Sequence, residues 1–188
     1  MKVLLTSCGL ETKGITNKFM DYIAQKAQKP SEIKALLIPT AAVTADAIEV
    51  LPKCLHDLLK CGVRKENICI YDLHVPMTQR NLDSFDVVYL CGGDPAYLLG
   101  RMREQHFQDV LLEFIKRDGI LVGVSAGSIL FAGNLKGNLG LLKSKLAVHC
   151  GERDCEKAGV LDASKSVIQL GNQQAIVFDG NNRAVILE

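Results

Sequence analysis

The sequence predicts an α/β fold, built from βα units around a mainly parallel sheet and completed by a β-rich C-terminal edge. Two observations support this prediction. Short β-branched or aliphatic runs alternate with longer segments of helical period over residues 2–125, whereas short apolar runs joined by turn residues fill the end of the chain. A chain of 188 residues fits one domain, which we expect to span residues 1–188 and to bury a core without disulfides or metal.

Five apolar runs are the expected strands of the parallel part of the sheet. They are residues 2–7, 34–40, 67–73, 86–93 and 119–125. Apolar side chains recur at helical spacing between these runs, which predicts helices. The expected helical stripes cover residues 15–27, 48–59 and 107–115.

The pattern changes after Gly133. Residues 135–145 are rich in Gly and Lys and are expected to form a loop, residues 146–150 are a short strand candidate, and residues 151–165 are polar and weakly structured. Residues 166–188 are typical of strands joined by tight turns, with the Asp-Gly-Asn-Asn segment 179–182 supplying residues tolerant of positive φ.

Composition excludes several classes of partner. The chain has 22 basic and 21 acidic side chains, so no field favours nucleic acid or an anionic membrane. Its seven cysteines are irregularly spaced without a Cys-x-x-Cys pair, which is typical of a reducing cytosol. Neither a signal peptide nor a run long enough to span a membrane is present, so we expect a cytoplasmic protein, either monomer or homodimer.

Polar or Gly-rich breaks follow four of the expected strands, and the carboxyl ends of parallel strands collect ligand-binding groups at one edge. These breaks are Ser7-Cys8-Gly9, Pro39-Thr40, Cys91-Gly92-Gly93-Asp94 and Ser125-Ala126-Gly127. We therefore expect them to converge.

The segment Gly123-Val124-Ser125-Ala126-Gly127 has the form of a nucleophile elbow, a sharp strand-to-helix turn that exposes the Ser hydroxyl. The backbone N–H of Ala126 would be a free donor at the start of a helix and could stabilise an oxyanion. A helix N-cap is the alternative role of Ser125.

Consecutive glycines in Cys91-Gly92-Gly93-Asp94-Pro95 let backbone N–H groups face a ligand, and Pro95 suits the first turn of a helix. The spacing matches no phosphate-binding loop. A Ser nucleophile also needs a base. Of the four histidines, His149 alone ends an apolar strand candidate downstream of the elbow, although a structural role is equally compatible with that position.

Five motifs in order give the chain a specific resemblance. They are IPTAA at 38–42, LCGGDPAYLL at 90–99, GVSAGS at 123–128, NLGLL at 138–142 followed by a His, and LGNQQAIVF at 170–178. Together they resemble the dipeptidase E family of serine peptidases, which includes aspartyl dipeptidases and is related to cyanophycinases.

The resemblance implies a doubly wound fold akin to class I glutamine amidotransferases, a flavodoxin-like three-layer sandwich. It also implies Ser125 as nucleophile, His149 as general base, and the N–H groups of Gly93 and Ala126 as oxyanion hole. The implied chemistry is acyl transfer to water in a site with neither metal nor cofactor.

The sequence departs from the family in two respects. The family's triad acid lies between the Ser and the His, but this chain has no Asp or Glu there, and Asn134 and Asn138 are the side-chain amides left in the interval. The candidates for a third triad member are therefore Asn134, Asn138 and a carboxylate distant in the sequence. Asp94 stands where the family commonly has Asn, and its carboxylate would oppose an oxyanion unless it contacts the His. Arg153, four residues after His149, is the nearest candidate cation for a substrate carboxylate.

These observations predict a serine peptidase that acts on small peptides, with Asp-X dipeptides as candidates. Two alternatives stay open. The chain could be a non-catalytic descendant that has lost the acid and acts as a small-molecule-binding or interaction module. A cysteine-based hydrolase is less favoured, because Ser occupies the elbow and Cys8 and Cys91 show no paired base.

Overall fold

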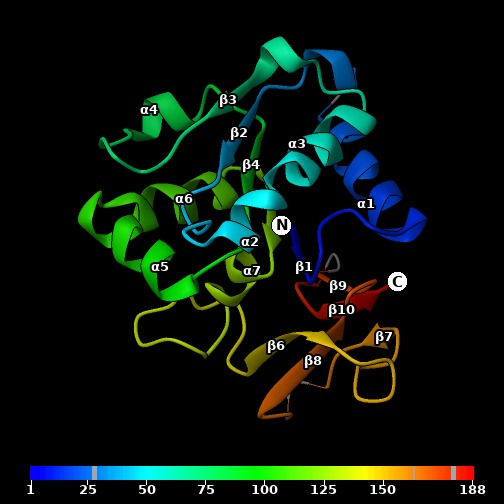
Figure 1. Ribbon diagram of the computed structural model, residues 1–188. Coiled ribbons are helices and arrows are strands. Elements are labelled where there is room, and N and C mark those ends of the chain that lie inside the picture. The colour runs from blue at the N-terminus through cyan, green and yellow to red at the C-terminus, as the bar shows by residue number, and fades with distance from the viewer. Residues whose placement is uncertain (27–28, 163, 179–180) are drawn as a thin grey trace.

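Within residues 1–26, 29–162, 164–178 and 181–188, which the computed structural model describes, eight strands form the main sheet in the order β3-β2-β4-β5-β1-β9-β10-β7 (Figure 1). The first five strands of this order are parallel, and β9, β10 and β7 add an antiparallel edge. Their bounds are β1 (Lys2–Thr6), β2 (Ala35–Ile38), β3 (Ile68–Ile70), β4 (Val87–Leu90), β5 (Ile120–Val124), β7 (Gly159–Val160), β9 (Ala175–Phe178) and β10 (Ala184–Leu187).

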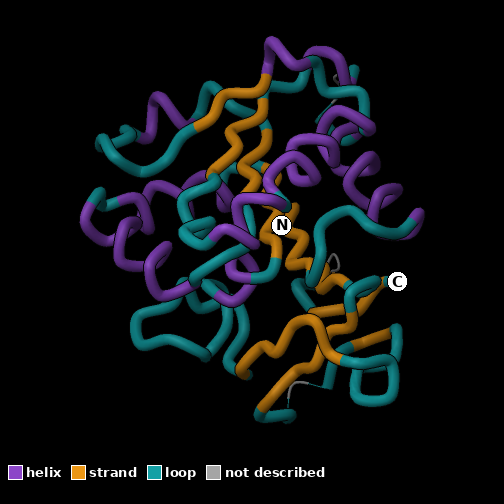
Figure 2. Tube along the Cα trace, in the orientation of Figure 1, coloured by secondary structure: helices purple, strands orange, loops and turns teal. Residues whose placement is uncertain are grey.

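A second, smaller sheet pairs β6 (Lys145–Cys150) with β8 (Val167–Gly171) in parallel. It lies beyond the carboxyl end of β1 and contacts α7 (Figure 2). The α-helices are α1 (Lys13–Ala24), α2 (Ala45–Glu49), α3 (Leu51–Lys60), α4 (Gln79–Leu82), α5 (Pro95–Glu104), α6 (Phe107–Lys116) and α7 (Ala126–Ile129), and short 3-10 helices are η1 (Pro30–Glu32) and η2 (Lys65–Asn67).

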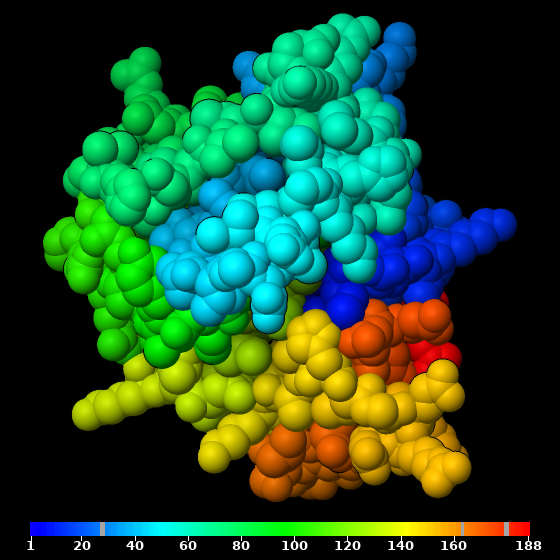
Figure 3. All heavy atoms as spheres, viewed as in Figure 1, coloured from blue at the N-terminus to red at the C-terminus, as the bar shows by residue number. Residues whose placement is uncertain are grey.

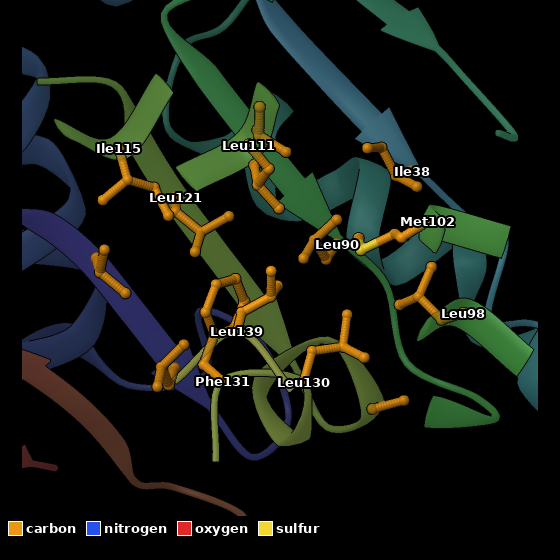
Figure 4. Close-up of a cluster of buried hydrophobic side chains, with 14 of the residues drawn as sticks. Ile38, Leu90, Leu98, Met102, Leu111, Ile115, Leu121, Leu130, Phe131 and Leu139 are labelled. Carbon is orange, nitrogen blue, oxygen red and sulfur yellow. The ribbon is translucent and has the colours of Figure 1, made fainter. Parts of the chain in front are cut away.

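Helices cover both faces of the main sheet, because side chains of the central strands alternate between two apolar clusters. Tyr89 of β4 packs in the cluster that α1 and α3 cover, whereas the next residue, Leu90, packs on the opposite face. There Leu98, Leu111 and Leu130 bring α5, α6 and α7 onto the sheet (Figure 4). The predicted doubly wound α/β fold with a β-rich C-terminal edge is therefore confirmed.

The five predicted strands and the helix at 107–115 are confirmed with small changes at their ends. The expected helix 48–59 divides into α2 and α3 at Val50, because Pro52 has no N–H to continue the first helix and instead occupies the first turn of the second. Helix α1 ends at Ala24, and residue 27, at the end of the predicted stripe, lies outside the described residues.

The C-terminal segment differs from the expectation in one respect. Strands β9 and β10 are antiparallel neighbours, as tight turns predict, but β8 leaves the main sheet to pair with β6. Of the turn expected at 179–182, the described residue Asn182 has φ +57°, and residues 179 and 180 lie outside the described residues. The polar segment 151–165 contributes β7. In the described ranges, no helix has the length and apolar character that crossing a membrane requires.

Candidate active site

Ser125 occupies a strained turn at the carboxyl end of β5. Its backbone has φ +48° and ψ −106°, between the last residue of β5 and the first residue of α7. A Cβ on Gly123 would lie 2.8 Å from the Gly127 carbonyl oxygen, and a Cβ on Gly127 would lie 2.6 Å from the Leu90 carbonyl oxygen. The turn therefore requires both glycines. Ser125 precedes α7 at the N-cap position, but its hydroxyl accepts no hydrogen bond from the described N–H groups of α7, so the side chain does not cap the helix.

His149 faces Ser125 from the second sheet. The Ser125 Oγ and His149 Nε2 atoms are 2.9 Å apart. The β6–β8 pairing is irregular between Ala147 and Cys150, and His149 has φ +60°. This bulge directs the imidazole toward the elbow. The His149 N–H donates to Ser7 Oγ at 2.9 Å, which ties the end of β6 to the loop after β1.

The other side of the imidazole contacts Asn172 and Cys8. His149 Nδ1 lies 3.0 Å from Asn172 Oδ1 and 3.3 Å from Cys8 Sγ, and the Cys8 thiol donates to the same Asn172 oxygen at 3.2 Å. The pKa of His149 is raised, mainly by the hydrogen bond with Cys8 and also by Asn172, against the opposing effects of burial and of the Lys53 charge. An amide and a thiol thus occupy the place where a triad has its acid.

Neither amide of the predicted interval takes this role. The Asn134 side chain holds the backbone of Leu146 through both its oxygen and its nitrogen, at 2.8 Å and 3.0 Å. Asn138 donates to the Leu135 carbonyl and accepts from the Gly140 N–H. Both stabilise the loop before β6. Sequence reasoning missed Asn172, although it stands in the motif LGNQQAIVF that contributed to the resemblance.

The predicted oxyanion donors are the backbone N–H groups of Gly93 and Ala126, which follow Gly92 and Ser125 in the sequence. Gly93 has φ +137°, and a Cβ there would lie 1.9 Å from the Ala41 carbonyl oxygen, so the loop after β4 requires glycine. The neighbouring Gly92 approaches Ser125 so closely that a Cβ on it would lie 3.4 Å from the Ser125 Cβ. In the part of the chain that the structure describes, neither the Gly93 N–H nor the Ala126 N–H has an acceptor.

The side chains of Asp94 and Arg153 do not contact the His149 imidazole. Asp94 Oδ1 accepts from the N–H groups of Ala96 and Tyr97, at 2.8 Å and 2.9 Å, and so caps α5 rather than contacting His149. Arg153 is exposed in the turn after β6, and it makes no ion pair with any residue of the described ranges.

Cys91 and Cys8, the two cysteines near the predicted site, differ in exposure and in contacts. Cys91 is fully buried at the end of β4, which excludes it as a nucleophile in this conformation. Cys8 was expected to lack a paired base, but its sulfur contacts His149. That expectation was wrong because the loop after β1 and the end of β6, distant in sequence, lie together. Figure 3 shows the blue N-terminal, yellow and orange segments meeting on one face.

A cavity of about 540 Å³ adjoins Asn172 on the side of β6 and β8. Cys150 and Cys155 line it, together with the carboxylates of Glu152 and Glu188, and none of its described lining residues is basic. In the described ranges, no group of three or more His, Cys, Asp or Glu side chains is arranged to hold a metal ion.

Comparisons with known proteins identify the family and the fold. The sequence model of peptidase family S51 matches residues 3–186. The fold is similar to the crystal structure of a proposed peptidase E protein from Listeria monocytogenes EGD-e, with a TM-score of 0.66, 18% sequence identity and coverage of 98% of each chain. No curated protein matches the chain. The predicted resemblance is therefore confirmed at the level of family and fold.

Proposed function

Because the chain belongs to peptidase family S51, we propose that it is a serine peptidase of small peptides in which Ser125 is the nucleophile and His149 the general base. The 2.9 Å contact between Ser125 Oγ and His149 Nε2 is the observation that carries the proposal. It joins a strained elbow to a base from another sheet, and the N–H groups of Gly93 and Ala126 have no acceptor among the described residues. This arrangement is the one that nucleophilic acyl transfer needs.

The proposed reaction follows from these positions. His149 Nε2 takes the Ser125 proton while Oγ forms a bond to the scissile carbonyl carbon. The carbonyl oxygen becomes negative and accepts hydrogen bonds from the Gly93 and Ala126 N–H groups. His149 then gives its proton to the leaving amine as the C–N bond breaks, and the acyl group stays on Ser125. In the second half of the reaction, His149 takes a proton from the water that attacks the acyl carbon. It returns that proton to Ser125 Oγ as the ester bond breaks.

The oxyanion donors are pre-organised because their backbone cannot rearrange freely. Gly93 packs against the Ala41 carbonyl, and the Asp94 N–H donates to that carbonyl at 2.8 Å. The Ala126 N–H begins α7, where the field of the free helix N-terminus favours negative charge. Rigid donors need no reorganisation when the charge develops, which lowers the barrier.

The proposed substrate class is small peptides, with Asp-X dipeptides first in order of testing because Arg153 follows β6 and could hold a carboxylate. The wall of the neighbouring cavity is acidic instead, through Glu152 and Glu188. Lys-X dipeptides are therefore the matched comparison. Faster turnover of Asp-X than of Lys-X, reduced by Arg153→Ala, supports the acidic preference; the opposite order refutes it.

A fluorophosphonate probe tests the nucleophile. We expect wild-type protein to be labelled on Ser125, with the site located by mass spectrometry, and Ser125→Ala to be unlabelled. Ser166→Ala, which removes an exposed hydroxyl far along the chain from the elbow, is the matched control and should label normally. Equal labelling of wild type and Ser125→Ala excludes the proposed nucleophile. A folded protein that is not labelled and turns over no dipeptide supports the non-catalytic alternative.

A further inference from the structure

An amide beside the base creates a tautomer problem that a carboxylate does not. His149 can accept the Ser125 proton on Nε2 only if Nδ1 carries the ring proton. A carboxylate can only accept, so it enforces that tautomer. The Asn172 amide can present either its oxygen or its NH₂ group to Nδ1. With the NH₂ group toward Nδ1, the ring proton would move to Nε2 and the base would be lost.

Cys8 favours the orientation of the amide in which the oxygen faces the imidazole. Its Sγ lies 3.2 Å from Asn172 Oδ1 and 3.3 Å from His149 Nδ1. With Nδ1 protonated, the amide oxygen is the acceptor for the thiol, and the sulfur can in turn accept from Nδ1–H. The His149 Nδ1–H and the Cys8 S–H therefore converge on one oxygen. The Asn172 NH₂ group makes no hydrogen bond to the described residues, so among them Cys8 is the group that distinguishes the two orientations.

The backbone around Cys8 is held by buried groups. The Gly9 N–H donates to Thr6 Oγ1 at 2.9 Å, and the Leu10 N–H donates to Asp57 Oδ2 at 2.8 Å. Asp57 is 1% exposed and also accepts from Tyr89 Oη at 2.7 Å. A Cβ on Gly9 would lie 2.4 Å from the Asp57 carboxylate, so the loop packs directly on it. Cys8 is thus presented to Asn172 by a fixed loop.

We propose that Cys8 is a positioning residue for His149: by donating to Asn172 Oδ1 it holds the amide oxygen toward Nδ1 and keeps the imidazole in the tautomer that can accept the Ser125 proton. This inference rests on the proposed function and concerns the same site. Among the described residues, the polar groups that contact His149 are Cys8, Asn172, Ser7 and Ser125, and the nearby charge is that of Lys53 of α3, which pairs with Glu11.

A double-mutant cycle between positions 8 and 172 tests the role. Cys8→Ala should lower kcat by about two- to tenfold at constant KM, the range expected for one hydrogen bond, and Cys8→Ser should restore it because a hydroxyl also donates. In an Asn172→Asp background, Cys8→Ala should have no such effect, since a carboxylate has no wrong orientation. Cys69→Ala, at an exposed edge-strand thiol, is the control. Equal losses in both backgrounds overturn the proposal.

The tautomer itself provides a readout that does not depend on peptide turnover. With ¹⁵N-labelled histidine, the NMR shifts of His149 should show Nδ1-protonated imidazole in wild type, a mixture of tautomers in Cys8→Ala, and the wild-type pattern in Cys8→Ser. The same tautomer in wild type and Cys8→Ala refutes the positioning role, even in an active peptidase. A tautomer change in a protein without peptidase activity supports the role of Cys8 and refutes the proposed function.

Discussion

Replacing Asn172 with Asp gives the imidazole the charge that the present site lacks. The Asn172 oxygen is already 3.0 Å from His149 Nδ1, so a carboxylate at that position needs no rearrangement. Unit charges about 4 Å apart attract by about 1 kcal/mol in water and about 4 kcal/mol near a protein surface. His149 is only partly desolvated, so we take a value between these limits, about 2 kcal/mol of added stabilisation of the imidazolium in the transition state. This corresponds to an increase of about 30-fold in kcat/KM.

Steady-state kinetics over a pH series measure this effect. The base works when His149 is neutral, and a carboxylate raises the pKa of His149 further, so the acid limb of kcat/KM should move to higher pH as the plateau rises. Asn81→Asp, at an exposed position of α4, adds the same charge far from the imidazole and should change neither. An unchanged or lower plateau in a folded Asn172→Asp protein refutes the assignment of Asn172.

Three further changes test parts of the site and its support. Gly93→Ala places a Cβ 1.9 Å from the Ala41 oxygen and should slow fluorophosphonate labelling at least about 100-fold, whereas Gly100→Ala, in open space on α5, should keep the rate; equal rates contradict the oxyanion role. Asp94→Ala should lower the free energy of unfolding by about 1 kcal/mol, as measured by thermal unfolding, because α5 loses its cap. Asp94→Asn keeps the cap and should speed fluorophosphonate labelling a few-fold, because it removes a charge beside Gly93. An unchanged labelling rate in Asp94→Asn argues against that charge effect. Asp57→Asn should cost about 3 kcal/mol in urea unfolding because it leaves Lys60 and the Leu10 loop without a buried carboxylate, and a cost below about 1 kcal/mol contradicts that support.

Much of the fold followed from local pattern. The apolar runs of β1, β4 and β5 are buried on both faces, so their hydrophobic character identified them without knowledge of their neighbours. The departure of β8 to a second sheet was not predictable, because the pairing of a strand depends on distant partners rather than on its own residues.

The site residues also divide into those that a local sequence pattern predicts and those that depend on distant partners. The elbow, His149 and the Gly93 loop are local motifs, and the structure brings them together. Asn172 was not predicted because it follows His149 by 23 residues, and no local pattern in the sequence pairs it with the imidazole. The parallel register of β6 and β8, which places Gly171 opposite Cys150, brings the residue after Gly171 to the imidazole. The contact between Asn172 and His149 therefore depends on the pairing of β6 with β8, which the local sequence does not specify.

The placement of Ser125 and His149 on separate sheets has a consequence for how such a site can change over evolution. The strained elbow depends on the tightly packed main sheet, where Gly123 and Gly127 tolerate no side chain. The imidazole and Asn172 depend on a two-stranded ribbon at the periphery. Insertions, deletions and new hydrogen-bonding partners in that ribbon alter the base while leaving the folding core intact. A lineage can therefore lose one orienting group and recruit another without losing its nucleophile.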